Sequence, residues 1–174
     1  MSSSLSEIRA SFRRLHHEGC FVLPNPWDVG SARMFQHLGF AALASTSSGY
    51  AWSTGRPDYR VTRDDVLDPE GPLDDPDAVS TAIDKLVAFA EAGADCLYAP
   101  GVREKADIAA MVRAVAPRPL NVLAMGPDRS LAEYADLGVR RVSVGGALAR
   151  VGWASVLSSA EQLKAGSFRG LAGA

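Results

Sequence analysis

One short unit recurs three times along the chain and constrains the fold more than any other feature. In each copy a helical segment ends at a glycine, a short apolar strand follows, and the strand runs into a loop of small residues. The copies are Leu38-Gly39 to Ser48-Gly49, Ala92-Gly93 to Pro100-Gly101, and Leu137-Gly138 to Gly145-Gly146. Strands that alternate with helices pair in parallel through right-handed crossovers. The sequence therefore predicts an α/β protein of the (β/α) barrel type, with ligands at the carboxyl ends of the strands.

The full pattern gives fewer strands than a closed barrel needs. We expect strands at 20–23, 40–44, 96–99, 120–124 and 139–144, and helices at 5–18, 29–38, 78–92, 104–115, 131–137 and 147–164. A closed barrel of this type has eight strands. We therefore predict one incomplete (β/α) domain over residues 1–174, with a Pro- and Asp-rich link at 60–77 and a frayed tail at 166–174.

Composition narrows the classes of partner and compartment. The formal net charge is -2 and there is no basic block, which argues against nucleic acid as a partner. Apolar runs are too short for a membrane span, and the first residues lack the layout of a secretory signal. Cys20 and Cys96 lie beside apolar residues and are expected to be buried thiols. These features together favour a cytoplasmic location.

The stretch 45–58, which follows the expected strand at 40–44, is the first candidate for a site. It is predicted to be a loop that holds small hydroxyl residues, two glycines, two aromatic residues and the pair Arg56 and Asp58. Small residues let backbone N–H groups approach a ligand closely. A Ser/Gly-rich connection without any ligand explains the same composition equally well.

Four motifs, in order, resemble the isocitrate lyase/phosphoenolpyruvate mutase family. They are the segments 24–32 (PNPWDVGSA), 47–58 (SSGYAWSTGRPD), 91–101 (EAGADCLYAPG) and 141–150 (RVSVGGALAR). The resemblance covers nearly the whole chain. It implies an α/β barrel that makes or breaks C–C or P–C bonds of small substrates related to 2-oxo acids, with Mg²⁺ as the expected cofactor.

The sequence also departs from the family. In the family, carboxylates that hold Mg²⁺ follow the third and fourth strands, and a substrate-binding arginine follows the fifth. Here no apolar strand lies between Leu67 and Asp77, so three strands and their helices are expected to be missing. The carboxylates at 64–77 lie in a Pro-rich stretch and do not obviously replace the metal ligands, so no metal-binding residue is identified.

The resemblance assigns roles to five residues. Ser48, Gly49 and Tyr50 match the loop that binds the substrate carboxylate through a hydroxyl and backbone N–H groups. Asp58 matches an acidic position near the metal's water shell, or caps a turn with Arg56. Arg150 matches a position where relatives place an arginine for the substrate carboxylate, or is simply a surface arginine.

Other polar residues are expected to be structural. Asp28 is better suited to capping a helix than to orienting a site, and Asn121 begins a strand rather than ending one. The histidines His16, His17 and His37 are expected at the surface.

Two functions remain open from the sequence. The first is a carbon–carbon lyase or phosphonomutase-like enzyme that acts on a small carboxylate through an enolate. The alternative is a shortened, inactive paralogue that binds small carboxylates or acts as a scaffold. Because an incomplete barrel exposes strand edges and apolar helix faces, we also expect a homo-oligomer, with two partial barrels completing one another.

Overall fold

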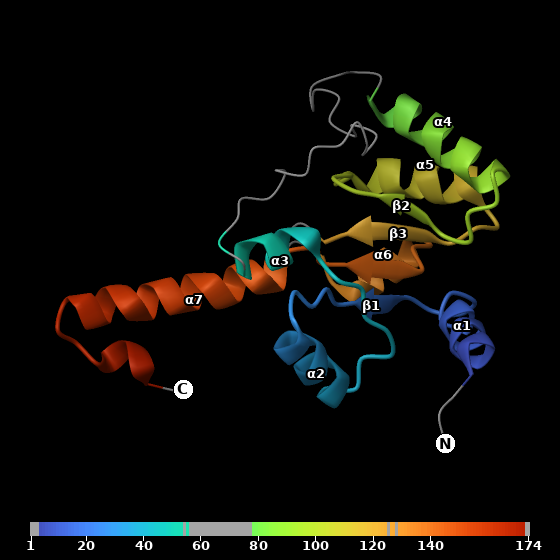
Figure 1. Cartoon of the computed structure of the whole chain (residues 1–174). Coiled ribbons are helices and arrows are strands. Elements are labelled where there is room, and N and C mark those ends of the chain that lie inside the picture. The colour runs from blue at the N-terminus through green and yellow to red at the C-terminus, as the bar shows by residue number, and fades with distance from the viewer. Residues whose placement is uncertain (1–3, 54, 56–77, 125, 128, 173–174) are drawn as a thin grey trace.

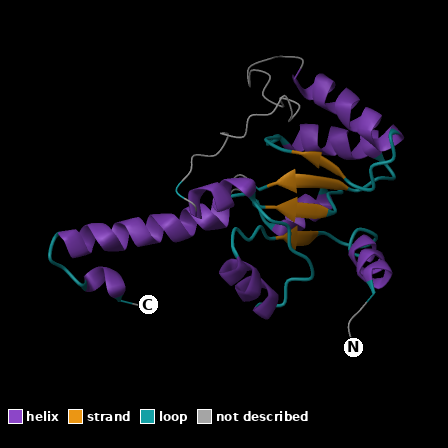
Figure 2. Ribbon diagram, viewed as in Figure 1, coloured by secondary structure: helices purple, strands orange, loops and turns teal. Residues whose placement is uncertain are grey.

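The fold is an open parallel sheet with helices around it (Figure 1). The computed structural model describes residues 4–53, 55, 78–124, 126–127 and 129–172. Four strands pair in the order β1-β4-β3-β2, and every pair is parallel (Figure 2). The strands are β1 (Phe21–Leu23), β2 (Leu97–Ala99), β3 (Leu120–Leu123) and β4 (Arg141–Ser143). The incomplete α/β architecture expected from the sequence is confirmed, and β1 and β2 are the edges of the sheet within the described residues.

Six helices lie at the expected segments, although the first ends at Arg14 rather than at residue 18, and a seventh, at Ser47–Ser53, lies where a loop was expected. They are α1 (Leu5–Arg14), α2 (Val29–His37), α3 (Ser47–Ser53), α4 (Ala78–Glu91), α5 (Lys105–Val115), α6 (Leu131–Asp136) and α7 (Ala147–Lys164), followed by a short 3₁₀ turn, η1 (Arg169–Leu171). None of the helices in the described ranges is long and apolar enough to span a membrane. The link at 60–77 lies outside the described residues.

The hydrophobic core lies between one face of the sheet and the helices α4 and α5. The alternation of side chains along each strand places one set of buried apolar residues toward α4 and α5. This core contains Leu97, Ala99, Leu120, Val122 and Val142 from the strands, and Leu86, Ile108, Met111 and Val115 from the helices. Burying such side chains is the main favourable term in folding. The sheet, α4 and α5 thus contain the main hydrophobic core of the described residues.

The opposite face of the sheet carries a polar network. Asn121 is buried, accepts a hydrogen bond from Arg141 Nε at 3.1 Å and donates one to Ser143 Oγ at 3.0 Å. Arg141 Nη1 donates to His16 Nε2 at 3.2 Å, while His16 Nδ1 lies 3.0 Å from the Phe12 carbonyl oxygen. Asn121 therefore has the structural role expected of it. A closed barrel would enclose this face.

His16 differs from its expected surface position. It is half-buried, and its ring packs edge-on against Phe12 and Phe21. Because Arg141 and a carbonyl oxygen have fixed hydrogen-bonding roles, the proton of the neutral ring lies on Nδ1. Burial lowers the pKa of His16, and the charge of Arg141 acts in the same direction.

The predicted strand at 40–44 does not join the sheet. This segment lies beside the chain that follows β1 and makes two backbone hydrogen bonds to it, from Ala44 N to Pro24 O at 3.2 Å and from Thr46 N to Pro26 O at 3.1 Å. Prolines have no N–H, so Pro24 and Pro26 accept hydrogen bonds but cannot return them. The apolar pattern predicted a strand, and the prolines opposite it prevent a complete ladder.

The predicted loop at 45–58 is partly helical. Residues Ser47–Ser53 form α3, and its first turn is closed by Thr46. The N–H of Tyr50 donates to Thr46 O at 3.1 Å, and the N–H of Gly49 lies 3.5 Å from Thr46 Oγ1. Hydroxyl residues ahead of a helix commonly supply such contacts. The hydroxyl-rich stretch thus begins a helix rather than a loop.

Helix α7 extends away from the sheet (Figure 1). Ala149 is its only buried residue among those described, and Val151, Val156 and Leu157 are more than half exposed. The tail, for which we predicted fraying, turns back at η1, where Ser159 Oγ donates to the carbonyl oxygen of Gly170 at 2.8 Å. Much of α7 therefore offers apolar surface to solvent.

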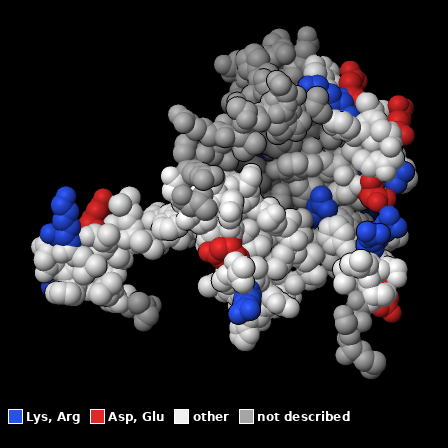
Figure 3. All heavy atoms as spheres, in the orientation of Figure 1, with Lys and Arg blue, Asp and Glu red and all other residues white. Residues whose placement is uncertain are grey.

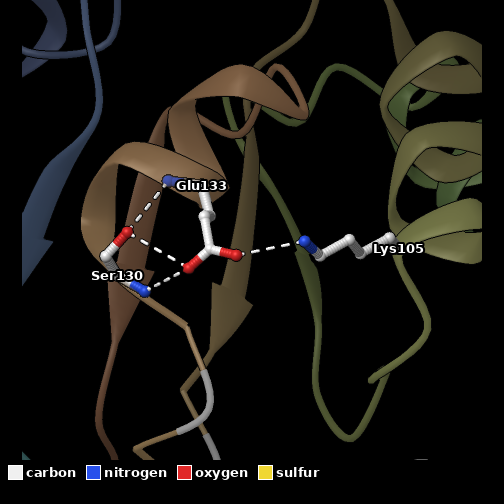
Figure 4. A network of polar contacts seen from close by, with 3 residues as sticks. All are labelled: Lys105, Ser130 and Glu133. Carbon is white, nitrogen blue, oxygen red and sulfur yellow. Dashed lines mark hydrogen bonds and ion pairs between the residues drawn. The ribbon is translucent and has the colours of Figure 1, made fainter.

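A capping network joins α5 to α6 (Figure 4). Ser130 caps α6: its Oγ accepts from the Glu133 N–H at 3.3 Å, and its own N–H donates to Glu133 Oε2 at 2.9 Å. Lys105 Nζ, at the start of α5, lies 3.0 Å from Glu133 Oε1. These donors stabilise the charged carboxylate and lower the pKa of Glu133 to about 2, with the backbone of Ser130 contributing most.

We expect Glu133→Gln to lower the free energy of unfolding at pH 7. A depressed pKa in the folded state stabilises the protein above the ordinary pKa of 4.5, and this contribution is lost as the pH falls toward about 2. Urea unfolding at several pH values should show the two proteins converging over that range. Glu161→Gln, an exposed position on α7, is the charge-matched control. A difference between wild type and Glu133→Gln that is independent of pH would contradict this explanation.

Candidate functional site

The candidate site lies at the carboxyl edge of the sheet, where the chain leaves β1 and β4. Asn25, just after β1, is buried, and its Oδ1 accepts hydrogen bonds from the N–H groups of Val144 and Gly145, both at 2.9 Å. Its Nδ2 donates to the carbonyl oxygen of Ala44 at 3.0 Å. One amide thus connects the segment after β1, the turn after β4 and the segment that leads into α3.

Helix α3 packs closely against the start of α7. A Cβ added to Gly49 would lie 2.7 Å from Trp27 Cβ, 2.8 Å from Thr46 Cγ2 and 3.2 Å from Ala149 Cβ. A Cβ added to Gly146 would lie 2.7 Å from Ser48 Oγ. Gly49 leaves no room for a side chain, and a side chain at Gly146 would require the Ser48 hydroxyl to move. The fold therefore brings the residues around 48 and those around 146–150 together.

Two of the predicted binding residues carry their polar groups to this contact. Ser48 is half-buried, and its Oγ lies 3.0 Å from Thr46 Oγ1. The guanidinium carbon of Arg150 lies 5.7 Å from the centre of the Trp52 ring, a cation–π distance. Trp52 also lies beside Gly146, at 3.2 Å from a Cβ placed there. A hydroxyl and an indole ring therefore lie beside Gly146, and the positive charge of Arg150 lies over that ring.

The remaining predicted residues are placed differently. Gly49 is buried and Tyr50 is 62% exposed, and the backbone N–H groups expected to bind a carboxylate take part in the first turn of α3. Asp58 lies outside the described residues. Asp28 caps α2, accepting from the Ser31 N–H at 2.7 Å, and that hydrogen bond lowers the pKa of Asp28. The capping role expected of Asp28 is confirmed.

A small cavity at the same edge contains residues that the sequence did not single out. It has a volume of about 190 Å³ and is lined by Arg103, after β2, and by Leu123, Arg129 and Tyr134, from β3 onward. Among the residues that the structure describes, the buried Nε of Arg129 has no hydrogen-bond partner. The sequence did contain a signal for this cavity, because Arg103 follows β2 and Arg129 follows β3, the next strand along the chain.

The described residues do not provide a metal site. They contain no group of three or more His, Cys, Asp or Glu side chains placed to hold an ion. The cysteines Cys20 and Cys96 are free and half-buried, and burial raises the pKa of Cys20 to about 11. These thiols are therefore protonated at neutral pH and suit packing rather than chemistry.

The sheet is open and parallel, and polar residues lie at its carboxyl edge. These features define a class of α/β proteins, related to the (β/α) barrels, that bind small molecules at that edge. Within this class, the chain belongs to the family described as phosphoenolpyruvate phosphomutase, which matches residues 12–71 and 69–164. The family resemblance of the four sequence motifs is thereby confirmed.

Solved structures agree with this assignment. A protein from Burkholderia cenocepacia J2315 assigned as a lyase/mutase superposes with a TM-score of 0.83 and 32% identity, over 97% of this chain and 92% of that one. The structure of 2,3-dimethylmalate lyase, a member of the PEP mutase/isocitrate lyase superfamily, gives a TM-score of 0.72 at 17% identity, over 94% and 88% of the two chains. At that identity the second likeness concerns the fold alone.

A relative from Mycobacterium tuberculosis (strain H37Rv), an uncharacterized protein, shows the internal shortening. It is 28% identical over 238 positions, which cover 88% of this chain and 91% of the relative. Because this chain has 174 residues, at least 64 of those positions (238 minus 174) have no counterpart in it. The two segments matched by the family meet at residues 69–71, within the link predicted at 60–77.

We expect Gly49→Ala to destabilise the protein by about 1–3 kcal/mol, because the added methyl group would lie within 3 Å of Trp27 Cβ and Thr46 Cγ2 and close to Ala149 of α7. The matched control is Gly152→Ala on α7, where an added Cβ meets nothing within 4 Å. That change should stabilise the protein by about 0.5–1 kcal/mol through helix propensity. Urea unfolding of both variants measures the two effects. A similar gain in stability for both would show that the contact at Gly49 is not tight in solution.

Proposed function

We propose that the chain binds a small carboxylate or 2-oxo acid at the contact between α3 and α7, as a carbon–carbon lyase or phosphonomutase-like protein. The observation that carries the proposal is the meeting of Ser48 and Arg150 around Trp52 and Gly146 at the carboxyl edge of the sheet. In parallel α/β proteins, this edge is where ligands bind. Family membership supports the lyase/mutase reaction class.

The side chains at this edge suit an anionic ligand. The Ser48 hydroxyl can donate a hydrogen bond to a carboxylate or enolate oxygen, and the Arg150 guanidinium supplies positive charge beside it. Arg103 and Arg129 in the small cavity would receive a second negative group. A structure of oxaloacetate acetylhydrolase with its product oxalate, similar in fold with a TM-score of 0.74, supports the choice of a dicarboxylate as the first probe.

In the complete family form, Mg²⁺ is expected to stabilise the charge of an enolate. The described residues offer no ligand set for it. The residues of this chain that we assign act by binding and orienting the carboxylate. Asp58, which the family resemblance places near the metal's water shell, remains a prediction.

The second candidate is a shortened paralogue without catalysis that binds small carboxylates or serves as a scaffold. Two observations favour it. At least 64 positions of the mycobacterial relative are missing here, and the described residues contain no cluster of acidic ligands. This candidate shares the carboxylate site with the first, so turnover is what separates them.

We expect the protein to bind oxalate in a calorimetric titration, and Ser48→Ala to weaken that binding about tenfold, the cost of one hydrogen bond to a charged group. Ser53→Ala is the control, because Ser53 is an exposed hydroxyl on the same helix whose Oγ donates to the Tyr50 carbonyl oxygen. Equal losses in both variants, or no loss in Ser48→Ala, would rule out a direct role for Ser48.

Turnover is measured with the same protein. If the protein is a lyase, we expect it to release pyruvate or a related product from members of a panel of 2-hydroxy tricarboxylates and oxaloacetate. This release should depend on added Mg²⁺. Oxalate binding without turnover on this panel would favour the second candidate. Absence of both binding and turnover would contradict both.

We also propose that the protein associates with itself through α7 and the open sheet. Helix α7 exposes Val151, Val156 and Leu157, and Figure 3 shows no charged side chain on the visible face of its middle part. The edges of the sheet at β1 and β2 are unpaired within the described residues. Surfaces of this kind are usually covered by a partner.

Sedimentation of the wild type should therefore show an oligomer, and Leu157→Glu should dissociate it. The neighbouring change Ser158→Glu introduces the same charge at an exposed polar position of α7 and should leave the oligomer intact. A monomeric wild type at micromolar concentration would contradict self-association. Equal dissociation by both variants would show that added charge, rather than the apolar surface, is responsible.

A further inference from the structure

A large groove lies at the end of the sheet opposite the candidate carboxylate site. It has a volume of about 990 Å³. One wall is α1 and the turn after it, and the other wall consists of the segments that lead into β2, β3 and β4. Figure 1 shows α1 at one end of the strands and α3 at the other. The groove is thus separate from the site proposed above.

The groove is basic in a chain that is acidic overall. Four arginines line it, Arg9 and Arg13 from α1, Arg118 before β3 and Arg140 before β4, against a single carboxylate, Asp95. With neutral histidines its formal charge is therefore +3, four arginines minus one aspartate, whereas the whole chain has a net charge of -2. A concave surface with an excess of one charge concentrates ligands of the opposite charge.

The arginines already converge on an anionic group. Arg13 Nη2 lies 3.2 Å from Asp95 Oδ2, and Arg118 Nη1 lies 4.0 Å from Asp95 Oδ1. Two guanidinium groups, more than 100 positions apart in the sequence, thus flank one carboxylate. All three side chains reach solvent, with exposed fractions of 66%, 42% and 67% for Arg13, Arg118 and Asp95. Exposed pairs contribute little stability, so a more highly charged ligand can compete with Asp95.

The groove also has an apolar part. Phe12 lines it and is 37% exposed, and Pro117 and Pro119 lie on the opposite wall. Arg140 is held in place because its Nη1 donates to the carbonyl oxygen of Gly19 at 3.2 Å. Guanidinium groups match phosphate oxygens in geometry, and aromatic and proline rings pack against planar or apolar groups. Charge and shape therefore favour a ligand with both a phosphoryl group and an organic part.

We propose that this groove is a binding site for an organic phosphate with at least two negative charges. Its phosphoryl group lies between Arg13 and Arg118, displacing Asp95, and its organic part packs on Phe12. The site is independent of the carboxylate site between α3 and α7, so either one can be absent without the other.

The test is a calorimetric titration of the full chain with inorganic pyrophosphate, with adenosine diphosphate as a probe organic phosphate, and with adenosine. Both phosphates should bind, the diphosphate more tightly than pyrophosphate, and adenosine should not bind detectably. Arg13→Gln and Arg118→Gln should each weaken both phosphates about tenfold. Asp95→Asn should strengthen them about threefold, because it removes the competing carboxylate.

Two controls make the result decisive. Arg33→Gln removes an exposed arginine of α2 and should leave phosphate binding unchanged, and so should Ser48→Ala at the other end of the sheet. The proposal is overturned if neither phosphate binds at millimolar concentration, or if Arg33→Gln weakens binding as much as Arg118→Gln does. It is also overturned if pyrophosphate binds as tightly as the diphosphate, since Phe12 then contributes nothing.

Discussion

The buried amide of Asn25 holds together the three chain segments on which the carboxyl edge of the sheet depends. It receives two N–H groups from the turn after β4 and donates to Ala44, ahead of α3. Leaving such groups unpaired in the interior costs about 1–3 kcal/mol each. With this edge fixed, Gly49 and Gly146 allow α3 and α7 to approach until Ser48 and Trp52 contact the start of α7. The hydrogen bonds of Asn25 thus fix the position of the three segments, and the two glycines allow the short distance between α3 and α7.

The two faces of the sheet differ in the side chains that they carry and in the helices that cover them. One face packs against α4 and α5 in a continuous core, whereas the other carries Asn121, Arg141 and Ser143 in a hydrogen-bonded network. In a closed barrel that second face would be enclosed by the remaining strands. Here His16 and Phe12 cover part of it, through the contact of His16 with Arg141. Two side chains of the N-terminal segment, Phe12 and His16, therefore cover part of the polar network that would otherwise be open to solvent.

The sequence predicted the elements whose signals are local and missed those that depend on a neighbour. Glycine ends and apolar periodicity located α2, α5 and α7 to within a residue or two. The apolar run at 40–44 looked like a strand because its failure to pair depends on Pro24 and Pro26, which are distant in the chain. The hydroxyls around 46–48 looked like a loop because Thr46 caps a helix with residues that are also common in turns.

The proposed functional surfaces divide in the same way. Ser48 and Arg150 were predicted from motifs, since each lies in a run of residues typical of the family. Asn25 was not singled out, because its role requires two N–H groups that lie almost 120 residues away. The basic groove was invisible because Arg13 and Arg118 are dispersed in a chain whose net charge is negative. Spatial clusters built from scattered residues leave no pattern in composition or periodicity.

The order of the strands explains how a shortened chain keeps its sheet. The pairing β1-β4-β3-β2 joins the first strand to the last three, so every retained strand has a retained neighbour. The two segments matched by the family meet at residues 69–71, between β1 and β2 in the sequence, and these two strands are the edges of the described sheet rather than neighbours in its hydrogen-bonded ladder. Removal of a central strand such as β3 or β4 would have left both of its neighbours without a hydrogen-bonding partner on that side. The shortening instead leaves two edges, and the retained strands still support the proposed carboxylate site at one end of the sheet and the proposed phosphate-binding groove at the other.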